Sequence, residues 1–318
     1  MIALIFIGRL SGNVSKITIF KKGNFKMVFS FLTKQNNKHS EGNILKEVFR
    51  DKINIPTLQM LVGLNDEGEP VTYDLATAPH LLTAGTTGSG VQKSINTMYL
   101  SMMEHNTPDD LKLIIIDNFG TEFNSYNKSP FMLTDVITDL KESVRAFRFL
   151  VQEMEIREKL LDQSHARNLE TYNSKVPDIM KIPRLVLYVD EVSILMYRHG
   201  DQIEDFMTRL GAKARSVGIT IHINTRFPNE DIIKGKVKAN LPSKIAYKLG
   251  SQIESDIVLG ELGAETLLGK GDSYVRWQDN SRLVRVKGIY LSDEETNSFI
   301  DSLVSKYPDE KYYKRIEF

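Results

Sequence analysis

Residues 79–98 constrain the fold more than any other stretch, because they join an apolar run to a helical pattern through a glycine-rich turn. The apolar run 81–84 predicts a short strand. Gly85, Gly88 and Gly90 predict a backbone that curls so that successive N–H groups point into the turn. The positive end of the following helix adds to this nest of N–H groups. The segment is therefore predicted to be an anion-binding loop between a strand and a helix.

The loop departs from the phosphate-loop pattern G-x-x-x-x-G-K-[ST] directly after its last glycine. Val91 and Gln92 stand where the pattern has a lysine and a hydroxyl, and Lys93 and Ser94 follow two positions late. Two residues on a helix correspond to a rotation of about 200°, so Lys93 would point away from the loop unless the loop slips. The candidate cofactor-binding residues form one continuous stretch: Gly85, Thr86, Thr87, Gly88, Ser89, Gly90, Val91, Gln92 and Lys93.

Strand and helix patterns alternate along the rest of the chain. Continuous apolar runs predict buried strands at 111–116, 185–189 and 219–223, and an amphipathic pattern predicts a long helix at 139–163. Further strands are predicted at 58–64, 71–75, 244–249 and 272–276, and further helices at 93–104 and 201–217. This alternation predicts an α/β fold with a mainly parallel central sheet flanked by helices, and a functional site at the carboxyl ends of the strands.

Polar residues follow two of the predicted strands. Asp190 and Glu191 fit a Walker B site, in which the first carboxylate orders Mg²⁺ and the second activates the attacking water. The alternative is a solvated strand end, which the glycine loop upstream disfavours. Asn224, Thr225 and Arg226 end the next strand, where P-loop motors place a polar sensor of the γ-phosphate. A simple turn after the strand is the alternative there.

Charge is balanced over the chain, with 41 Lys and Arg against 41 Asp and Glu. This balance excludes a global basic field, so any attraction to nucleic acid has to come from a local patch. Lys234, Lys236 and Lys238 lie in the segment 231–244, which is either a flexible basic loop suited to phosphate contacts or a solvated surface. Arg215 belongs to a helical pattern whose basic residues could be solvated, reach a neighbour's nucleotide, or face DNA.

Other compositional features narrow the class of protein. The chain has no cysteine, which excludes disulfides and thiolate metal sites, and its six histidines show no ligand spacing. Its apolar run near the start is too short to span a bilayer or to serve as a signal sequence. We therefore expect a soluble, cytoplasmic protein with no metal other than Mg²⁺.

Two units are predicted, a small leading module at 1–43 and a large domain at 44–318. Segments 14–20 and 25–31 alternate in hydrophobicity on either side of a turn-prone stretch, which predicts a β-hairpin. The polar run 34–42 then reads as a linker.

Eight motifs occur in the order and at the spacing of one known family. They are Pro-His-Leu-Leu-Thr-Ala-Gly-Thr-Thr-Gly-Ser-Gly at 79–90, Ile-Asn-Thr-Met at 95–98, Asp-Asp-Leu-Lys-Leu-Ile-Ile-Ile-Asp at 109–117, Glu-Met-Glu at 153–155, Arg-Asn-Leu-Glu at 167–170, Val-Asp-Glu at 189–191, Lys-Ala-Asn-Leu-Pro-Ser at 238–243 and Gly-Ala-Glu-Thr-Leu-Leu-Gly-Lys-Gly-Asp at 263–272. From about residue 44 to residue 303 the chain resembles the motor domain of the FtsK/SpoIIIE family of DNA translocases.

The resemblance implies a RecA-like P-loop NTPase that binds ATP and Mg²⁺ and assembles as a hexameric ring around double-stranded DNA. It implies catalytic roles for Asp190, as the metal ligand, and for Glu191, and we add Arg226 as a candidate compensating cation. The candidate DNA-binding residues are Lys234, Lys236, Lys238 and Arg215. The leading module resembles a shortened form of the family's small domain. A membrane or replication protein is a further candidate partner.

The chain departs from the family pattern at four sites. Val91 and Gln92 replace lysine and serine, and Phe119 replaces a lysine near Asp117. Thr225-Arg226-Phe227-Pro228 replaces Thr-Gln-Arg-Pro, and Asp256 stands where an arginine is often found.

Two functions are compatible with the sequence. One is an ATP-driven DNA translocase or DNA-transfer motor, such as that of a mobile element, favoured by the intact Asp190 and Glu191. The other is a catalytically degenerate ring or adaptor subunit that does not hydrolyse ATP, favoured by the displaced lysine.

Overall fold

The computed structural model describes residues 7–8, 16–17, 57–78, 80–278 and 280–318. Within this part, β1 (Ile7–Gly8) and β2 (Lys16–Ile17) form a two-stranded antiparallel pair. Most of the predicted hairpin, including segment 25–31, and the linker 34–42 lie outside the described residues. The leading module therefore stays a prediction.

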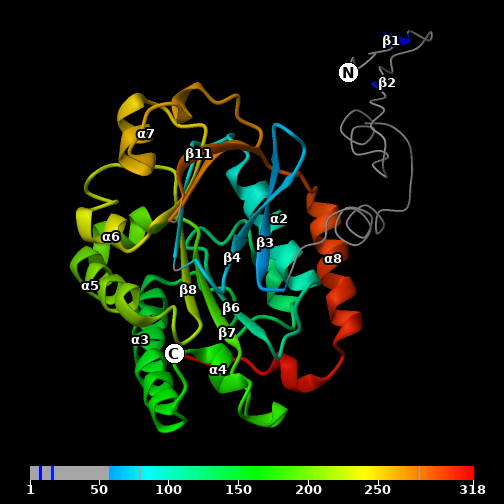
Figure 1. Cartoon of the computed structure of the whole chain (residues 1–318), viewed down its shortest axis with the longest axis vertical. Coiled ribbons are helices and arrows are strands. Elements are labelled where there is room, and N and C mark those ends of the chain that lie inside the picture. The colour runs from blue at the N-terminus through cyan, green and yellow to red at the C-terminus, as the bar shows by residue number, and fades with distance from the viewer. Residues whose placement is uncertain (1–6, 9–15, 18–56, 79, 279) are drawn as a thin grey trace, which may run out of the picture.

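The remaining elements build one large α/β unit (Figure 1). Its strands are β3 (Gln59–Asn65), β4 (Pro70–Asp74), β5 (Leu81–Ala84), β6 (Leu111–Ile116), β7 (Arg184–Val189), β8 (Ile219–Thr225), β9 (Ser243–Tyr247), β10 (Asp272–Trp277) and β11 (Asn280–Lys287). Its α-helices are α2 (Val91–Glu104), α3 (Leu140–Gln163), α4 (Leu169–Asn173), α5 (Val192–Lys213), α6 (Gly235–Ala239), α7 (Gln252–Leu259) and α8 (Asp293–Lys306). Four short 3-10 turns complete it: η1 (Asn124–Lys128), η2 (Asp178–Met180), η3 (Ala264–Thr266) and η4 (Glu310–Tyr313).

The strands form one nine-stranded sheet in the order β4-β3-β11-β10-β9-β5-β8-β7-β6. The five strands from β9 to β6 are parallel, and β10, β11, β3 and β4 extend the sheet with antiparallel pairs. β5 lies in the parallel part between β8 and β9, so the loop that leaves it has the carboxyl ends of two strands beside it. This arrangement confirms the predicted α/β fold with a parallel sheet at its centre.

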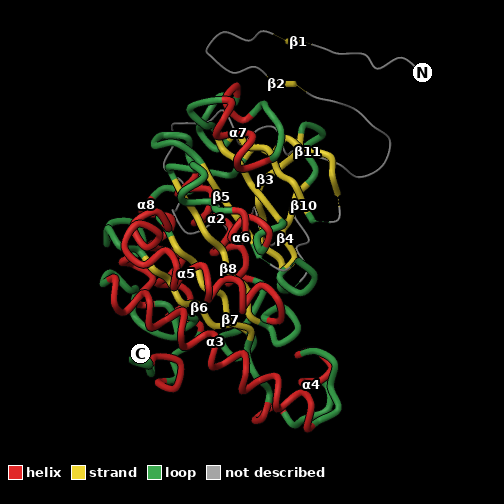
Figure 2. The backbone as a smooth tube through the Cα atoms, turned by 90° about the vertical axis from the view of Figure 1, so that its left-hand side faces the viewer, coloured by secondary structure: helices red, strands yellow, loops and turns green. Residues whose placement is uncertain are grey.

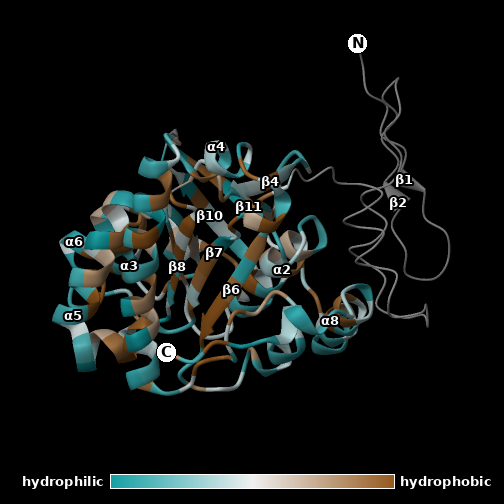
Figure 3. Ribbon diagram, turned by 90° about the horizontal axis from the view of Figure 1, so that it is seen from below, coloured by the Kyte–Doolittle hydropathy of each residue, from teal (hydrophilic) through white to brown (hydrophobic). Residues whose placement is uncertain are grey.

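Helices cover both faces of the sheet (Figures 1 and 2). Successive residues of a strand point to opposite faces, and the parallel strands are apolar on both. Leu82, Ile114 and Ile116 pack with α3 and α5, whereas Leu81, Leu113 and Ile115 pack with α2 and α8. Figure 3 shows the result as hydrophobic strands between helices whose outer surfaces are hydrophilic. None of the helices in the described part is long and apolar enough to span a bilayer.

The structure differs from the sequence prediction in three places. Helix α5 begins at Val192, where the side chain of Glu191 accepts the N–H of Ser193 and caps it, and is kinked at His199, so the helix predicted from 201 corresponds to its second stretch. Strand β11 and helices α4, α7 and α8 were not predicted, although Ser292 and Glu295 form a capping box before α8. Third, the segment predicted to be a flexible basic loop contains helix α6.

Candidate functional site

The glycine loop links the carboxyl end of β5 to the start of α2. Gly88 and Gly90 adopt left-handed backbone angles, with φ values of 83° and 90°, which glycine reaches without steric cost. Helix α2 has no side-chain cap, and in the described part of the chain the N–H groups of Thr87, Gly88 and Gly90 donate to no other group. The loop is therefore a concave nest of free donors at the positive end of a 14-residue helix, which suits an anion.

The residues that follow the loop do not supply a cation to it. Val91 is buried, and the side-chain amide of Gln92 donates to Oδ1 of Asp190. The ammonium of Lys93 pairs with Asp293 at the start of α8. This placement agrees with the rotation of about 200° that separates Lys93 from the first helical position. It gives no support to the expectation that Lys93 takes part in cofactor binding.

Asp190 lies fully buried at the end of β7, beside the loop. Its Oδ1 also accepts the hydroxyl of Tyr188 at 2.8 Å, and its Oδ2 lies 3.6 Å from the guanidinium of Arg226. Burial raises the pKa of Asp190, and the hydrogen bonds from Gln92 and Tyr188 and the charge of Arg226 oppose this shift. The sequence prediction that this carboxylate lies within reach of the loop is therefore correct.

Asp190 also fits the part of a magnesium ligand. Its Oδ2 accepts no hydrogen bond, and the ion pair with Arg226 at 3.6 Å is the one charged contact that the described residues give it. Mg²⁺ commonly uses one or two carboxylates and completes its octahedron with water and phosphate oxygens. Among the described residues there is no cluster of three acidic, His or Cys side chains, so an ion at Asp190 would depend on such oxygens.

Glu191 is held by three donors from two segments. Its Oε1 accepts the N–H of Ser193 at 3.1 Å and the hydroxyl of Thr225 at 2.8 Å, and its Oε2 accepts the N–H of Arg226 at 2.8 Å. The side chain is 1% exposed. The orientation of this carboxylate therefore depends on the end of β8.

A buried chain of hydrogen bonds supports the same strand end. The side-chain amide of Asn224 donates to the backbone oxygen of Asp190 at 2.7 Å, and its carbonyl accepts the hydroxyl of Thr83 at 2.9 Å. Since this hydroxyl donates to Asn224, it accepts from Nε2 of His222 at 3.1 Å, and Nδ1 of His222 accepts the hydroxyl of Tyr99 at 2.9 Å. Burial lowers the pKa of His222 to about 3, so the ring is neutral. Sequence patterns could not reveal this series of hydrogen bonds, because it joins residues of β5, α2 and β8.

Arg226 occupies the mouth of the site. Its guanidinium lies 5.7 Å from the centre of the Phe119 ring, which is 53% exposed, while it faces Asp190 on its other side. The replacement of the expected lysine by Phe119 thus gives Arg226 an aromatic surface to pack on. Asp117, at the end of β6, accepts four backbone N–H groups of the following turn at 2.9–3.3 Å and shapes that turn.

The three predicted DNA-binding lysines lie on or next to α6. Lys234 and Lys236 each approach Glu204 of α5 at 3.5 Å, and Lys238 donates to the backbone oxygen of Asp256 at 3.4 Å. Residues 235–239 of this segment form a short helix that the two ion pairs join to α5, which corrects the prediction of a loop there. Of the two lysines paired with Glu204, Lys236 is the more exposed, with 74% of its side chain accessible to solvent.

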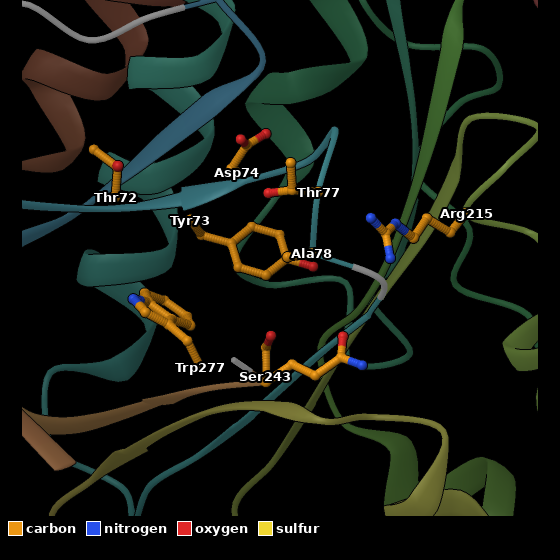
Figure 4. Close-up of a pocket in the computed structure, with 9 residues that line it drawn as sticks. Thr72, Tyr73, Asp74, Thr77, Ala78, Arg215, Ser243 and Trp277 are labelled. Atoms are coloured by element: carbon orange, nitrogen blue, oxygen red, sulfur yellow. The ribbon is translucent and has the colours of Figure 1, made fainter. Parts of the chain in front are cut away.

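Arg215 lies elsewhere, at the opposite edge of the sheet from the glycine loop. It faces a pocket of about 520 Å³ at the amino ends of β8 and β9 (Figure 4). The rings of Tyr73 and Trp277, whose centres are 5.7 Å apart, line the pocket together with Ser243. Glu204 and Lys213, the last residue of α5, are nine positions apart, a helical rise of about 14 Å, and Arg215 lies in the turn beyond the helix. The structure therefore does not bring Arg215 together with the lysines of α6.

Sequence reasoning assigned no role to a turn that covers the glycine loop. This turn is residues 269–271, just before β10, and the N–H of Gly271 donates to the backbone oxygen of Ser89 at 2.8 Å. Gly90 packs so closely on the turn that a β-carbon at this position would lie 3.1 Å from Cα of Lys270. The sequence feature that could have indicated this turn is the pair of glycines on either side of Lys270.

Comparison with known proteins identifies relatives of this chain. The FtsK/SpoIIIE family model matches residues 45–229, more than half of the chain. DNA translocase FtsK of Haemophilus influenzae is 40% identical over 270 residues, which cover 77% of this chain and 51% of the relative. DNA translocase FtsK of Pasteurella multocida is 39% identical over 280 residues, covering 80% and 30%. The chain thus spans about half or less of the length of these relatives.

Solved structures agree with this relationship. The pCW3 conjugation coupling protein TcpA, in a monomer form with ATPγS, is 26% identical with a TM-score of 0.69, covering 79% of this chain and 72% of that one. The cytoplasmic domain of the Thermomonospora curvata type VII secretion ATPase EccC, at 22% identity and a TM-score of 0.70, shares the fold over 83% of this chain and 33% of its own. From the extent of the family match and the identity to its members, the chain belongs to the FtsK/SpoIIIE family.

Proposed function

We propose that this chain is the motor of an ATP-dependent double-stranded DNA translocase or DNA-transfer machine. The observation that carries the proposal is the placement of Asp190 and Glu191, both buried and oriented, beside a nest of free N–H groups. The relatives named DNA translocase support the choice of DNA as the substrate. The likeness to a conjugation coupling protein supports transfer of DNA by a mobile element.

Each group at the site has a role in this proposal. The N–H groups of the glycine loop bind the phosphates of ATP. Asp190 holds Mg²⁺, which supplies positive charge to the phosphate oxygens when it is bound. Glu191 accepts the proton of the attacking water, since its carboxylate is fixed by Ser193, Thr225 and Arg226. Arg226 can turn from Asp190 toward the γ-phosphate, because its ion pair with Asp190 is long, at 3.6 Å, and its other contact is the exposed ring of Phe119.

The motor is proposed to act as a ring, most simply a hexamer, around the duplex. A chain with no net charge cannot enclose DNA by itself, whereas repeated copies of one basic patch can surround it. Arg226 and Phe119 lie exposed or half-exposed at the mouth of the site, where a neighbouring subunit would complete it.

The function is tested by measuring ATP hydrolysis with and without duplex DNA, and by sedimentation of the same mixtures. We expect hydrolysis to rise several-fold with duplex DNA and ring oligomers to form in the presence of DNA and ATP. Hydrolysis that duplex DNA leaves unchanged, together with a monomer at high protein concentration with both ligands present, would contradict the proposal.

Replacing Lys234, Lys236 and Lys238 together by alanine is expected to weaken binding to all duplex sequences about equally. Phosphate contacts carry no base information, and each one lost lowers the slope of log affinity against log salt by about 0.9. Fluorescence anisotropy over a salt series measures both effects. Because Lys234 and Lys236 already face Glu204, unchanged affinity and slope would mean that these lysines serve only to attach α6 to α5. Arg215 lies at the other edge of the sheet, so the variant Arg215→Ala tests its predicted contact with DNA separately from the lysines.

One observation favours a second function, a nucleotide- or DNA-binding ring subunit that does not hydrolyse ATP. The amide of Gln92 holds Asp190, and Lys93 is engaged by Asp293, so the loop itself carries no cation. If this function is correct, the unsubstituted chain has no turnover, and Val91→Lys with Gln92→Ser creates it by restoring charge to the loop. Turnover in the unsubstituted chain excludes this second function.

A further inference from the structure

The phosphate loop has a deficit of positive charge. ATP brings a cluster of negative charge, and P-loop enzymes meet it with a lysine inside the loop as well as with N–H groups. Here that position is Val91, Gln92 is neutral, and Lys93 is paired with Asp293. The hydroxyl of Ser89, on a residue 2% exposed, and Oδ2 of Asp190 are both buried without a hydrogen-bond partner. The site is thus built for a ligand, and its charge has to come from outside the loop.

Two lysines lie beside the loop, and the first of them, Lys270, belongs to the covering turn. It adopts a left-handed backbone, with φ at 55°, between Gly269 at 80° and Gly271 at 87°. This conformation is unfavourable for a lysine, so its neighbours impose it. Those neighbours are the phosphate loop itself: Gly271 donates to the oxygen of Ser89, and the Cβ position of Gly90 lies 3.1 Å from Cα of Lys270.

Lys248 is the second cation beside the loop, at the carboxyl end of β9. Its backbone oxygen accepts both the N–H of Thr86, at 2.9 Å, and the hydroxyl of Thr86, at 3.0 Å. Its Cδ lies 3.8 Å from the Cβ position of Gly269, so its side chain runs along the covering turn. Lys248 and Lys270 are both exposed, and no ion pair holds either of them in the described part of the chain.

We propose that Lys248 and Lys270 replace the missing loop lysine and bind the phosphate groups of ATP from the covering turn. A lysine ammonium reaches about 6 Å from its Cα, and both residues start in contact with the loop or with the turn on it. Two flexible ammonium groups can follow the phosphates while Gln92 keeps Asp190 in place. The inference rests on the proposed binding of ATP and names the residues that make this loop competent for it.

The test is ATP affinity of the full chain, measured by fluorescence titration with a fluorescent ATP analogue and by competition with ATP and with adenosine. Lys270→Gln and Lys248→Gln are each expected to weaken ATP binding by about tenfold, and the double variant by more, because each loses a charge-assisted contact. Affinity for adenosine is expected to stay the same. Lys159→Gln, which changes an exposed lysine on α3, serves as the matched control and is expected to change neither affinity.

Two further variants separate charge from backbone effects. Lys270→Gly removes the same charge and accepts the left-handed backbone without strain, and Lys270→Arg keeps the charge. We expect the glycine variant to match Lys270→Gln and the arginine variant to retain most of the affinity for ATP. Equal losses of ATP and adenosine binding would overturn the inference in favour of a structural role.

The remaining outcomes distinguish this inference from the function on which it rests. If the unsubstituted chain binds ATP and the double variant binds it equally well, the lysines have no part in binding and the proposed motor still stands. If the unsubstituted chain binds no ATP at any accessible concentration, the proposed motor fails and the inference fails with it.

Discussion

Replacing Glu191 by glutamine is expected to lower ATP hydrolysis at least about a hundredfold, which is the typical minimum contribution of a positioned general base. The carboxylate is buried and oriented by Ser193, Thr225 and Arg226. A glutamine keeps one oxygen for the first two donors, but its amide cannot accept a proton from water. It also places an N–H₂ group against the N–H of Arg226, where Oε2 now accepts. Phosphate release at saturating ATP measures the effect.

Binding of ATP should survive this substitution, since Glu191 does not belong to the phosphate loop. ATP affinity is therefore measured beside turnover, and Glu230→Gln, at an exposed glutamate just beyond β8, provides the control. Full turnover in the Glu191→Gln protein would assign the base to another group and remove the catalytic role proposed for Glu191.

Acidification from pH 7 to pH 4 is expected to lower the free energy of unfolding by about 3 kcal/mol through His80 and by a similar amount through His222. Burial lowers the pKa of His80 from 6.5 to about 4 and that of His222 from 6.5 to about 3. Both rings are neutral in the folded protein, and Nδ1 of His80 accepts the N–H of Ile221 at 3.0 Å. The unfolded chain takes up these protons near pH 6.5, so the stability is complete above pH 6.5 and is lost as the pH falls toward the folded pKa values.

Urea denaturation at a series of pH values measures this loss. In a His222→Gln protein the decrease between pH 7 and pH 4 should be smaller by about 3 kcal/mol, because one of the two buried titrating groups is gone. His165→Asn is the control, since His165 is exposed and asparagine tolerates its left-handed backbone. An equal pH dependence in the His222→Gln and unsubstituted proteins would show that His222 does not titrate with a lowered pKa.

Much of the site could be predicted because parallel strands impose a simple geometry. Once the apolar runs 81–84, 185–189 and 219–223 are recognised as parallel strands, their carboxyl ends must meet at one edge. The residues that follow them, the glycine loop, Asp190 and Asn224, then lie together, as the structure has them. Strand β6 was predicted with the bounds it has, 111–116, because both of its faces are largely buried and Lys112 is the one polar residue in its apolar run.

Charged side chains were harder to place, because their partners come from distant parts of the chain. The lysines of α6 read as an open basic patch in the sequence, but Glu204 lies against two of them in the fold. Arg215 was grouped with them by charge alone, and the second half of α5 separates it from Glu204. No local pattern encodes such pairings.

The sequence by itself determined the strands, the glycine loop and the acidic residues at its edge, since these depend on hydrophobic periodicity and on backbone angles that act over a few residues. Only the tertiary structure decided which cations lie near the loop. It turns Lys93 toward Asp293, 200 positions away, and closes residues 269–271 over Gly90. Both contacts depend on where β10, β11 and α8 lie relative to β5 and α2, and packing between such distant segments leaves no periodic trace along the chain.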